Sequence, residues 1–491
     1  MAIKLNTSSV APAKARVDML VVGMYKGRKA GPGSDICDKS SLVLLEAVGF
    51  KGDAGEIATV TASGVAAKCI VVAGLGDKSK LDANAIREVA AAIARRAKSV
   101  KTVATTVLTD ADKAMGAAEA AQAFAEGTVL GGYEYLKYKS EATASTLNSV
   151  TVLGGSAKSS SGLANGSTIA AAVITARDLV NEPAAGQSPA AFAAFAQRVA
   201  RKAGLKCTVY SGAQLEKLRL TGTITVGSGS VRGPRFVKLE YSTKDARTTL
   251  GFIGKGVVFD SGGLSLKPST GMEQMKTDMA GGAAVLGAMS VLATLGVRAN
   301  VVGYIPLVEN MPSGSAYRLG DVIRYRNNKT VEVMNTDAEG RLILADALAL
   351  AADDGVDAMI DLATLTGACV VALGPQIAGL MGNNQSWIDQ VKSASDNVGE
   401  QLWPLPLPPE YKKMLDSEIA DMKNIGGAYG GALTAGLFLQ EFVGEVPWVH
   451  LDIAGPARAE SDNGINVRGG SGFGVRTLLE LAQHFHKPRR N

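Results

Sequence analysis

The sequence predicts an α/β protein with two domains, a small N-terminal α/β domain and a larger C-terminal domain with a mostly parallel central sheet covered by helices. Length is the first reason, since 491 residues exceed what one hydrophobic core usually supports. The second is the alternation of short apolar, β-branched runs with longer segments of helical spacing, which is typical of parallel sheets. The third is composition, because 57 glycines and only 5% aromatic residues favour close contact between helices and a sheet.

The first third of the chain is expected to form the smaller domain, residues 1–166, which we expect to make oligomer contacts. Strands are predicted in its apolar, β-branched runs, at residues 17–24, 69–75 and 150–153. Helices are predicted where apolar and alanine positions recur at helical spacing, at residues 82–97 and 111–138. A glycine- and serine-rich stretch, residues 154–167, marks the end of this domain.

The next segment, residues 167–183, is predicted to be an interdomain helix that ends before Pro183, because a proline disfavours helical backbone at the residue before it. The larger domain is assigned to residues 184–491. Its predicted strands are residues 250–253, 300–306, 358–362 and 448–453. Its longest predicted helices are residues 281–295 and 341–352. In such a sheet, functional groups belong on the loops that follow the carboxyl ends of the strands.

Bulk properties exclude several classes of protein. A net charge of +5 is a weak signal for nucleic-acid binding, and the three histidines exclude an HExxH zinc helix or a three-histidine site. The N-terminus has no continuous apolar signal region, and the apolar stretch 359–374 is interrupted by Asp361 and by Thr and Gly, so no membrane span is expected. The four cysteines form no CxxC pair, which favours buried thiols in a reducing, cytoplasmic environment.

Charged side chains concentrate in two short segments, residues 255–278 and the octapeptide NTDAEGRL at residues 335–342. Together these segments contain Lys255, Asp260, Lys267, Asp278, Asp337, Glu339 and Arg341. Carboxylates that converge repel one another unless a cation lies between them. An oxygen-rich set of ligands suits Mg, Mn or Zn. The sequence therefore predicts a metal-dependent enzyme.

Each charged residue also has an ordinary structural explanation. Asp278 stands before a predicted helix and is a candidate cap, and a lysine near carboxylates is often only an ion-pair partner. Lysine binds a metal only after losing its proton, which two nearby dications would favour, so from physics alone both explanations stay open. On an extended backbone Asp337 and Glu339 would point to the same face. The four acids fit two metal ions better than one.

Two segments carry a resemblance to a known family. GKGVVFDSGGLSLKPSTGMEQMKTDMAGGA (residues 254–283) and NTDAEGRLILADAL (residues 335–348) resemble the leucine (cytosol) aminopeptidase family. The resemblance implies a homohexamer with a bound bicarbonate and two divalent metal ions per subunit, Mn or Zn, with Mg or Co as further possibilities. It extends to both domains in layout and to most of the C-terminal domain in motif.

The resemblance also implies a role for each charged residue. Asp260 and Glu339 would bridge both metal ions, Lys255 and Asp278 would complete one metal site, and Asp337 the other. Lys267 would bind the substrate carbonyl oxygen and stabilise the negative charge that develops there. Arg341 would hold the bicarbonate, and the bicarbonate would act as the general base. The remaining implied substrate-binding residues are Met275, Thr364, Leu365 and Gly367, although Met275 as an ordinary core residue stays open.

The implied reaction is hydrolysis of the first peptide bond of peptides with a free N-terminus, preferably after leucine and other apolar residues, by attack of a metal-activated water. Two alternatives remain. In the first, the basic groups at residues 26–29, 95–101 and 198–202 would bind DNA, and the protein would have an additional transcriptional or recombination accessory role. The ordinary explanation of these groups is solvated surface charge. A two-metal phosphatase would share the carboxylates, but it explains neither the lysine ligand nor the octapeptide.

Overall fold

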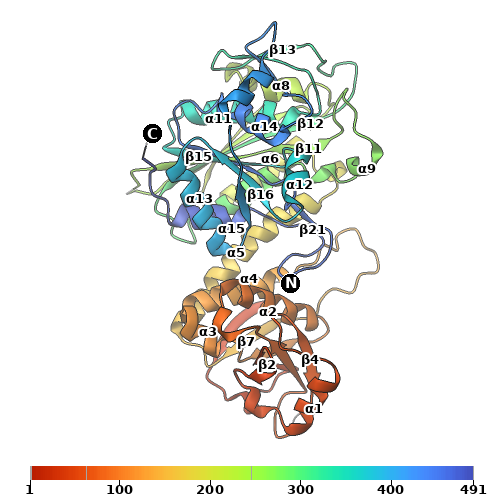
Figure 1. The fold of residues 1–491 in the computed structure, drawn as a ribbon, viewed down its shortest axis with the longest axis vertical. Helices are drawn as coiled ribbons and strands as arrows, with labels where there is room; N and C mark the ends of the chain where they lie inside the picture. Colours follow the sequence, from red (N-terminus) through yellow and green to blue (C-terminus); the bar gives the residue numbers. More distant parts are fainter. Residues whose placement is uncertain (1–2, 62, 245, 490–491) are drawn as a thin grey trace. The chain divides into compact units, whose positions relative to one another are not determined.

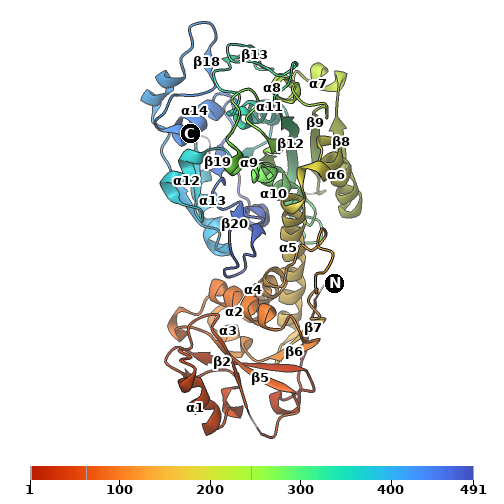
Figure 2. The same ribbon diagram turned by 90° about the vertical axis from the view of Figure 1, so that its right-hand side faces the viewer.

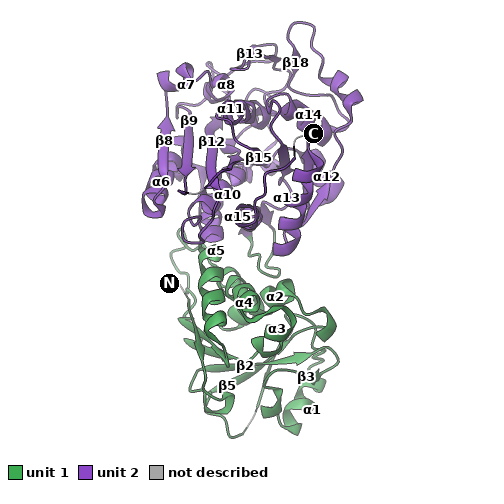
Figure 3. Cartoon of the chain, turned by 90° about the vertical axis from the view of Figure 1, so that its left-hand side faces the viewer, with its two compact units in different colours: residues 1–171, 460–468 green, residues 172–459, 469–491 purple. Residues whose placement is uncertain are grey.

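The computed structural model describes residues 3–61, 63–244 and 246–489, which form two compact units coloured separately in Figure 3. Unit 1 comprises residues 1–171 and 460–468, and unit 2 comprises residues 172–459 and 469–491. Each unit has its own sheet and its own hydrophobic core. The predicted α/β class with two domains is therefore correct.

Unit 1 contains a seven-stranded sheet in the order β1-β7-β6-β2-β5-β4, with β3 paired to β2. Its strands are β1 (Lys4–Ser8), β2 (Met19–Tyr25), β3 (Lys29–Ala30), β4 (Ile57–Val60), β5 (Cys69–Gly74), β6 (Thr102–Thr105) and β7 (Ser149–Leu153). Its helices are α1 (Lys39–Ala47), α2 (Ala83–Arg96), α3 (Leu108–Met115), α4 (Ala117–Gly131) and the first part of α5 (Ala157–Asn181). Alternate residues of β2 enter two cores, Met19 and Val21 packing with residues of α2 and α4, and Leu20 and Val22 with Leu45 of α1. Both faces of this sheet are thus covered.

One helix prediction in unit 1 is wrong in detail, and one segment without a predicted helix is helical. The single helix predicted at residues 111–138 is two helices, α3 and α4, separated by Gly116, whose φ of 93° is unsuited to a helix. The glycine- and serine-rich stretch 154–167, where no helix is predicted, is helical from Ala157 onward. Gly162 and Gly166 explain this, because they face the backbone of α4 closely. A Cβ on Gly162 would lie 2.1 Å from a backbone oxygen of α4, and a Cβ on Gly166 would lie 2.3 Å from another. These glycines permit close helix packing, which the sequence pattern alone does not distinguish from a loop.

Unit 2 contains a nine-stranded sheet in the order β17-β16-β19-β15-β10-β12-β9-β8, with β11 paired to β12. Its strands are β8 (Lys206–Tyr210), β9 (Arg235–Tyr241), β10 (Thr249–Gly254), β11 (Gly256–Asp260), β12 (Asn300–Asn310), β15 (Ala358–Ala363), β16 (Ala378–Gly382), β17 (Leu402–Pro404) and β19 (Trp448–Asp452). Short strands outside it are β13 (Val322–Arg324), β14 (Thr330–Glu332), β18 (Met422–Lys423), β20 (Arg458–Ala459) and β21 (Gly469–Gly470). The central strands β19, β15, β10 and β12 are parallel, and antiparallel pairs occur toward both edges.

Helices cover both faces of the unit 2 sheet, as the two views in Figures 1 and 2 show. One group contains α8 (Thr221–Gly227), α11 (Glu339–Asp353) and α14 (Gly431–Gln440), and the other contains α6 (Pro189–Ala203), α10 (Ala280–Met289), α13 (Gln385–Val398) and α15 (Val475–Gln483). The remaining helices are α7 (Ala213–Lys217), α9 (Ser269–Met272) and α12 (Gly367–Leu373). Asp346 fixes α11 to α8, since its Oδ2 accepts hydrogen bonds from the backbone N and the Oγ1 of Thr223 at 2.6 and 2.8 Å.

The strand register determines where the polar residues gather. The first half of β12 pairs with β10 and its second half with β11, so β11 continues along β12 from the point where β10 ends. Because β10, β11, β12, β15 and β19 are mutually parallel, their carboxyl ends point the same way. Lys255, Asp260, Asn310, Thr364 and Asp452 lie at or directly after these ends. The predicted positions of Lys255, Asp260 and Thr364 at or after the carboxyl ends of strands are thus confirmed.

Among the described residues, no helix combines the length and apolar character needed to cross a membrane. All four cysteines are free thiols, but only Cys369 is fully buried, while Cys37, Cys69 and Cys207 are half-buried. The prediction of four buried thiols was therefore correct for one of them.

Candidate active site

The two charged segments of the sequence meet at the carboxyl ends of the parallel strands. Lys255 follows β10, Asp260 is the last residue of β11, and Asp278 precedes α10. Glu339 is the first residue of α11, whereas Asp337 lies in the turn before it. The backbone from Asp337 to Glu339 is therefore not extended. The turn and the helix start nevertheless direct both carboxylates toward Asp260.

Glycines permit the close approach of the backbone segments around Lys255. A Cβ on Gly281 of α10 would lie 2.0 Å from the carbonyl oxygen of Leu362, and one on Gly254 would lie 2.5 Å from the oxygen of Gly281. A Cβ on Gly340 would lie 2.5 Å from Cε of Lys255. The glycine of the octapeptide is therefore needed for the lysine side chain to pass the first turn of α11.

Each lysine lies between carboxylates. Nζ of Lys255 is 2.7 Å from Oδ1 of Asp278 and 2.9 Å from Oε1 of Glu339. Nζ of Lys267 is 2.8 Å from Oδ2 of Asp260 and 2.5 Å from Oδ1 of Asp337. Four acids face two ammonium groups, so the cluster has a formal excess of two negative charges when all six groups are ionised.

Burial divides the cluster into a closed side and an open side. Lys255, Asp260, Asp278 and Glu339 are buried, whereas the side chains of Lys267 and Asp337 are 19% and 33% exposed. Burial raises the pKa of Asp278 well above its ordinary value, despite the opposing effect of Lys255. Burial, together with the charge of Glu339, also raises the pKa of Asp260. The acids therefore lack the positive charge that would hold all of them ionised.

The arrangement fits divalent metal ions. One carboxylate oxygen from each of Asp260, Asp337 and Glu339 lies within 4.8 Å of the others, a separation suited to shared ligands. Oδ2 of Asp278 is buried and has no hydrogen-bond partner among the described residues. Oε1 of Glu339 contacts Lys255 only as an ion pair without hydrogen-bond geometry. Buried carboxylate oxygens left in this state are costly unless a cation compensates them. Hard oxygen donors with one amine suit Mn, Zn, Mg or Co.

Arg341 lies on the buried side, in the first turn of α11. Its NH1 group donates a 2.7 Å hydrogen bond to the carbonyl oxygen of Asn424, and its Nε has no hydrogen-bond partner among the described residues. Burial lowers the pKa of Arg341 to about 10, which leaves the guanidinium charged near neutral pH. Arg341 therefore retains its charge and one buried N–H donor that the described residues do not use.

The loop after β15 joins the charged cluster to the neighbouring strand. Nζ of Lys255 donates to the carbonyl oxygen of Thr364 at 2.9 Å, and Oγ1 of Thr364 donates to Oδ1 of Asp278 at 2.7 Å. Buried Asp452, at the end of β19, accepts hydrogen bonds from the backbone N of Leu365 and from Oγ1 of Thr366. The loop that contains Thr364 and Leu365 is thus fixed at both ends.

The other predicted substrate-binding residues lie near this edge of the sheet. Gly367 is exposed and begins α12, and Leu365 is half-buried. Met275 is half-buried and begins the short 3-10 helix Met275–Thr277, which packs against β11. Its half-buried position suits either the wall of a pocket or an ordinary core residue.

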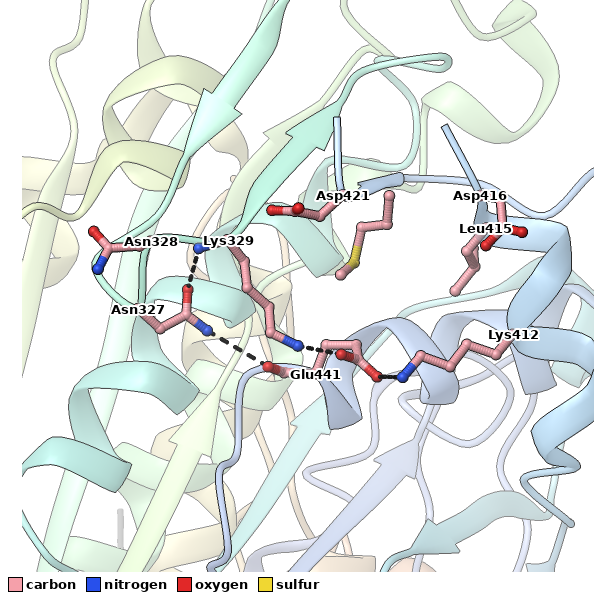
Figure 4. Close-up of a pocket in the computed structure, with 9 residues that line it drawn as sticks. Asn327, Asn328, Lys329, Lys412, Leu415, Asp416, Asp421 and Glu441 are labelled. Atoms are coloured by element: carbon pink, nitrogen blue, oxygen red, sulfur yellow. Dashed lines mark hydrogen bonds and ion pairs between the residues drawn. The ribbon is translucent and has the colours of Figure 1, made fainter. Parts of the chain in front are cut away.

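A cavity of about 470 Å³ lies elsewhere in unit 2 (Figure 4) and contains none of the predicted site residues. Glu441 stands between Lys329 and Lys412 in this cavity, and both ammonium groups contact its carboxylate. The carboxylate of Glu441 is therefore already neutralised by two lysines.

The sequence-based prediction missed two buried asparagines, Asn310 and Asn424, that support the cluster. Buried Asn310 donates to Oδ1 of Asp260, and buried Asn424 accepts from the backbone N of Met334 and donates to the backbone oxygen of Asn335. Asn310 carries the only signal that could have been used, since it is a polar residue at the carboxyl end of a strand, like Asp260. Asn424 is distant in sequence and lies in no predicted element.

Comparisons with known proteins give consistent results. The family model described as the cytosol aminopeptidase family, catalytic domain, matches residues 174–479, and the model for the N-terminal domain of that family matches residues 21–142. Proteins named probable cytosol aminopeptidase from Alkaliphilus metalliredigens and Streptomyces coelicolor are each 42% identical to this chain. The first alignment covers 96% of this chain and 97% of that protein, and the second covers 98% of both.

Solved structures agree over nearly the whole chain. The bottromycin maturation enzyme BotP in complex with Mn is 39% identical, with a TM-score of 0.87 over 95% of this chain and 99% of that one. A mutant of tomato leucine aminopeptidase is 34% identical, with a TM-score of 0.87 over 98% of this chain and 96% of that one.

Proposed function

The chain belongs to the cytosol aminopeptidase family, and we propose that it uses two divalent metal ions to release leucine and other apolar residues from the N-terminus of peptides. Family membership makes the chain a metal-dependent aminopeptidase. The observation that carries the two-metal proposal is the convergence of Asp260, Asp337 and Glu339, with Asp278 and Lys255 buried behind them. When bound, the metal ions would supply Lewis acidity and activation of water.

In this proposal the role of each ligand is the one that the family resemblance implies. Asp260 and Glu339 would be ligands of both ions, Lys255 and Asp278 would complete one site, and Asp337 would complete the other. Lys255 can act as a ligand only as the neutral amine, whereas its ion pairs with Asp278 and Glu339 now favour its charged form. Metal binding would therefore exchange these ion pairs for a metal bond and release a proton.

Lys267 and Arg341 are the two cations with direct roles in the reaction. Lys267 lies on the open side of the cluster, so its ammonium group is placed to contact the carbonyl oxygen of an entering substrate. Arg341, with its unpartnered Nε, would hold a bicarbonate ion that accepts a proton during the reaction. Thr364, Leu365 and Gly367 would orient the substrate through the loop that Asp452 fixes.

Further parts of the proposal rest on the family rather than on geometry. These are preference for leucine with Met275 in the side-chain pocket, Mn or Zn as the natural metal, a homohexameric assembly and a location in the cytoplasm. The solved structure of BotP with Mn supports manganese as one metal the fold accepts. The DNA-binding and phosphatase alternatives receive no support from the relatives, which are named as aminopeptidases.

A pair of substrates that differ only at the amine tests the proposal. We expect leucine p-nitroanilide to be hydrolysed and N-acetyl-leucine p-nitroanilide to react at least about a hundredfold more slowly, because the acetylated nitrogen offers neither charge nor a basic lone pair to the acidic centre. Initial rates of both compounds with the Mn-loaded protein give the result. Alanine, phenylalanine and glutamate p-nitroanilides serve as a matched series for the leucine preference. Comparable rates for the free and acetylated compounds would contradict an exopeptidase.

A further inference from the structure

Asn310, the last residue of β12, lies directly beneath the charged cluster and is completely buried. The nitrogen of its amide group makes two hydrogen bonds, whereas the oxygen makes none to the described residues. Nδ2 donates to Oδ1 of Asp260 at 2.9 Å and to the carbonyl oxygen of Thr336 at 2.9 Å, so both of its protons are used. Oδ1 of Asn310 is buried and has no partner among the described residues. The amide is thus retained for its two donors, at the cost of an unsatisfied acceptor.

The two acceptors belong to the two segments that supply the acids. Asp260 ends β11, and Thr336 immediately precedes Asp337 in the octapeptide. Other bonds join the same segments, since Oγ1 of Thr336 donates to the oxygen of Gly262 and the backbone N of Ser265 donates to Oγ1 of Thr336, each at 2.7 Å. The bonds of Thr336 to Gly262 and Ser265 do not involve an acid of the cluster, whereas Asn310 donates directly to Asp260.

The contacts of Asp260 show what the Asn310 amide does. Oδ1 of Asp260 accepts from the backbone N of Gly262 and from Asn310, each at 2.9 Å, while Oδ2 faces Lys267 at 2.8 Å. Two donors on one oxygen fix the rotation of the carboxylate. Gly263 leaves room for this amide, because a Cβ there would lie 2.8 Å from Oδ1 of Asn310.

We propose that Asn310 is a positioning residue for metal binding, which holds the carboxylate of Asp260 and the Thr336–Asp337 turn in the geometry that receives the metal ions. The inference rests on the proposed two-metal function. Groups that orient metal ligands typically change metal affinity by about 10- to 100-fold when removed. The effect should appear in metal binding itself, without any assay of the reaction.

Asn310→Leu is the decisive variant. It removes both donors, but Asp260 keeps the hydrogen bond from Gly262 and Thr336 keeps that from the hydroxyl of Tyr317 at 2.7 Å, and the unsatisfied acceptor disappears. We therefore expect the metal-free variant to fold with an unfolding midpoint close to that of the wild type. Asn310→Ser is prepared alongside it, so that a smaller residue is measured if leucine does not fit.

Two control variants separate positioning from general loosening. Tyr317→Phe removes a donor to Thr336 without affecting Asp260. Asn384→Leu alters another buried asparagine of unit 2, whose side chain accepts from the backbone N of Trp387 and donates to the oxygen of Arg489. Neither control should change the metal affinity by more than about twofold.

The experiment is calorimetric titration of Mn²⁺ into each metal-stripped protein, with thermal unfolding of the same samples. The expected result is a 10- to 100-fold higher Kd for Asn310→Leu and Asn310→Ser, with both controls near the wild type. Binding by Asn310→Leu within twofold of the wild type, or equal weakening in Asn384→Leu, would overturn the inference while leaving the proposed function intact. A wild-type protein that binds no Mn²⁺ would overturn both.

Discussion

Glu339→Ala is expected to lose nearly all aminopeptidase activity, by about a thousandfold or more, together with most of its bound metal. Glu339 is buried between Lys255 and the other acids, and as a bridging carboxylate it would compensate the charge of both ions. Its removal leaves two cations close together and poorly neutralised. Loss of several kcal/mol of charge stabilisation corresponds to about that decrease in rate.

The matched comparison is Asp337→Ala, with Asp260→Ala as the second bridging variant. Asp337 is the more exposed acid and would serve only one ion, so Asp337→Ala should retain more metal than either bridging variant. Metal analysis of the purified proteins after dialysis decides between these assignments. Equal metal content in all three variants would contradict the bridging role of Asp260 and Glu339.

Lys267→Ala is expected to reduce kcat by about 10²- to 10³-fold while KM changes little. The ammonium group lies on the open side of the cluster, where it would contact the carbonyl oxygen as negative charge develops. Such an interaction is stronger in the transition state than in the bound substrate, so its loss appears in kcat. Steady-state kinetics with leucine p-nitroanilide provide both constants.

Lys412→Ala is a suitable control for this variant, because Lys412 is also paired with a carboxylate but lies in the separate cavity of Figure 4. It should leave both constants unchanged. If Lys267→Ala raises KM with kcat preserved, Lys267 is a contact of the bound substrate only, and the proposed role in the transition state is wrong.

Local pattern predicted most of the architecture that positions the site. Apolar runs located the strands β10, β12, β15 and β19 within a few residues, because buried parallel strands require continuous apolar sequence. The octapeptide and the segment 255–278 located the charged residues, since so many charges have no ordinary reason to be near buried strands. Roles of individual residues, and the exact domain limits at residues 166 and 183, stay predictions.

Features that depend on tertiary packing could not be predicted. The helical state of residues 157–167 depends on α4, against which Gly162 and Gly166 pack. The position of Glu339 depends on a turn at Asp337 that is held by Asn424 and Asn310, residues distant in sequence. An asparagine with such long-range partners carries no local signal.

Metal removal and return tests the central claim most directly. The wild-type protein is stripped with a chelator, and activity on leucine p-nitroanilide is followed as Mn²⁺ or Zn²⁺ is added in known equivalents, with far-UV circular dichroism recorded throughout. We expect the metal-free protein to be inactive but folded, because the acids lie at the edge of a sheet with its own hydrophobic core. Activity should then return and saturate at two equivalents of metal per chain. Activity that survives complete metal removal, or that saturates at one equivalent, would contradict a two-metal aminopeptidase.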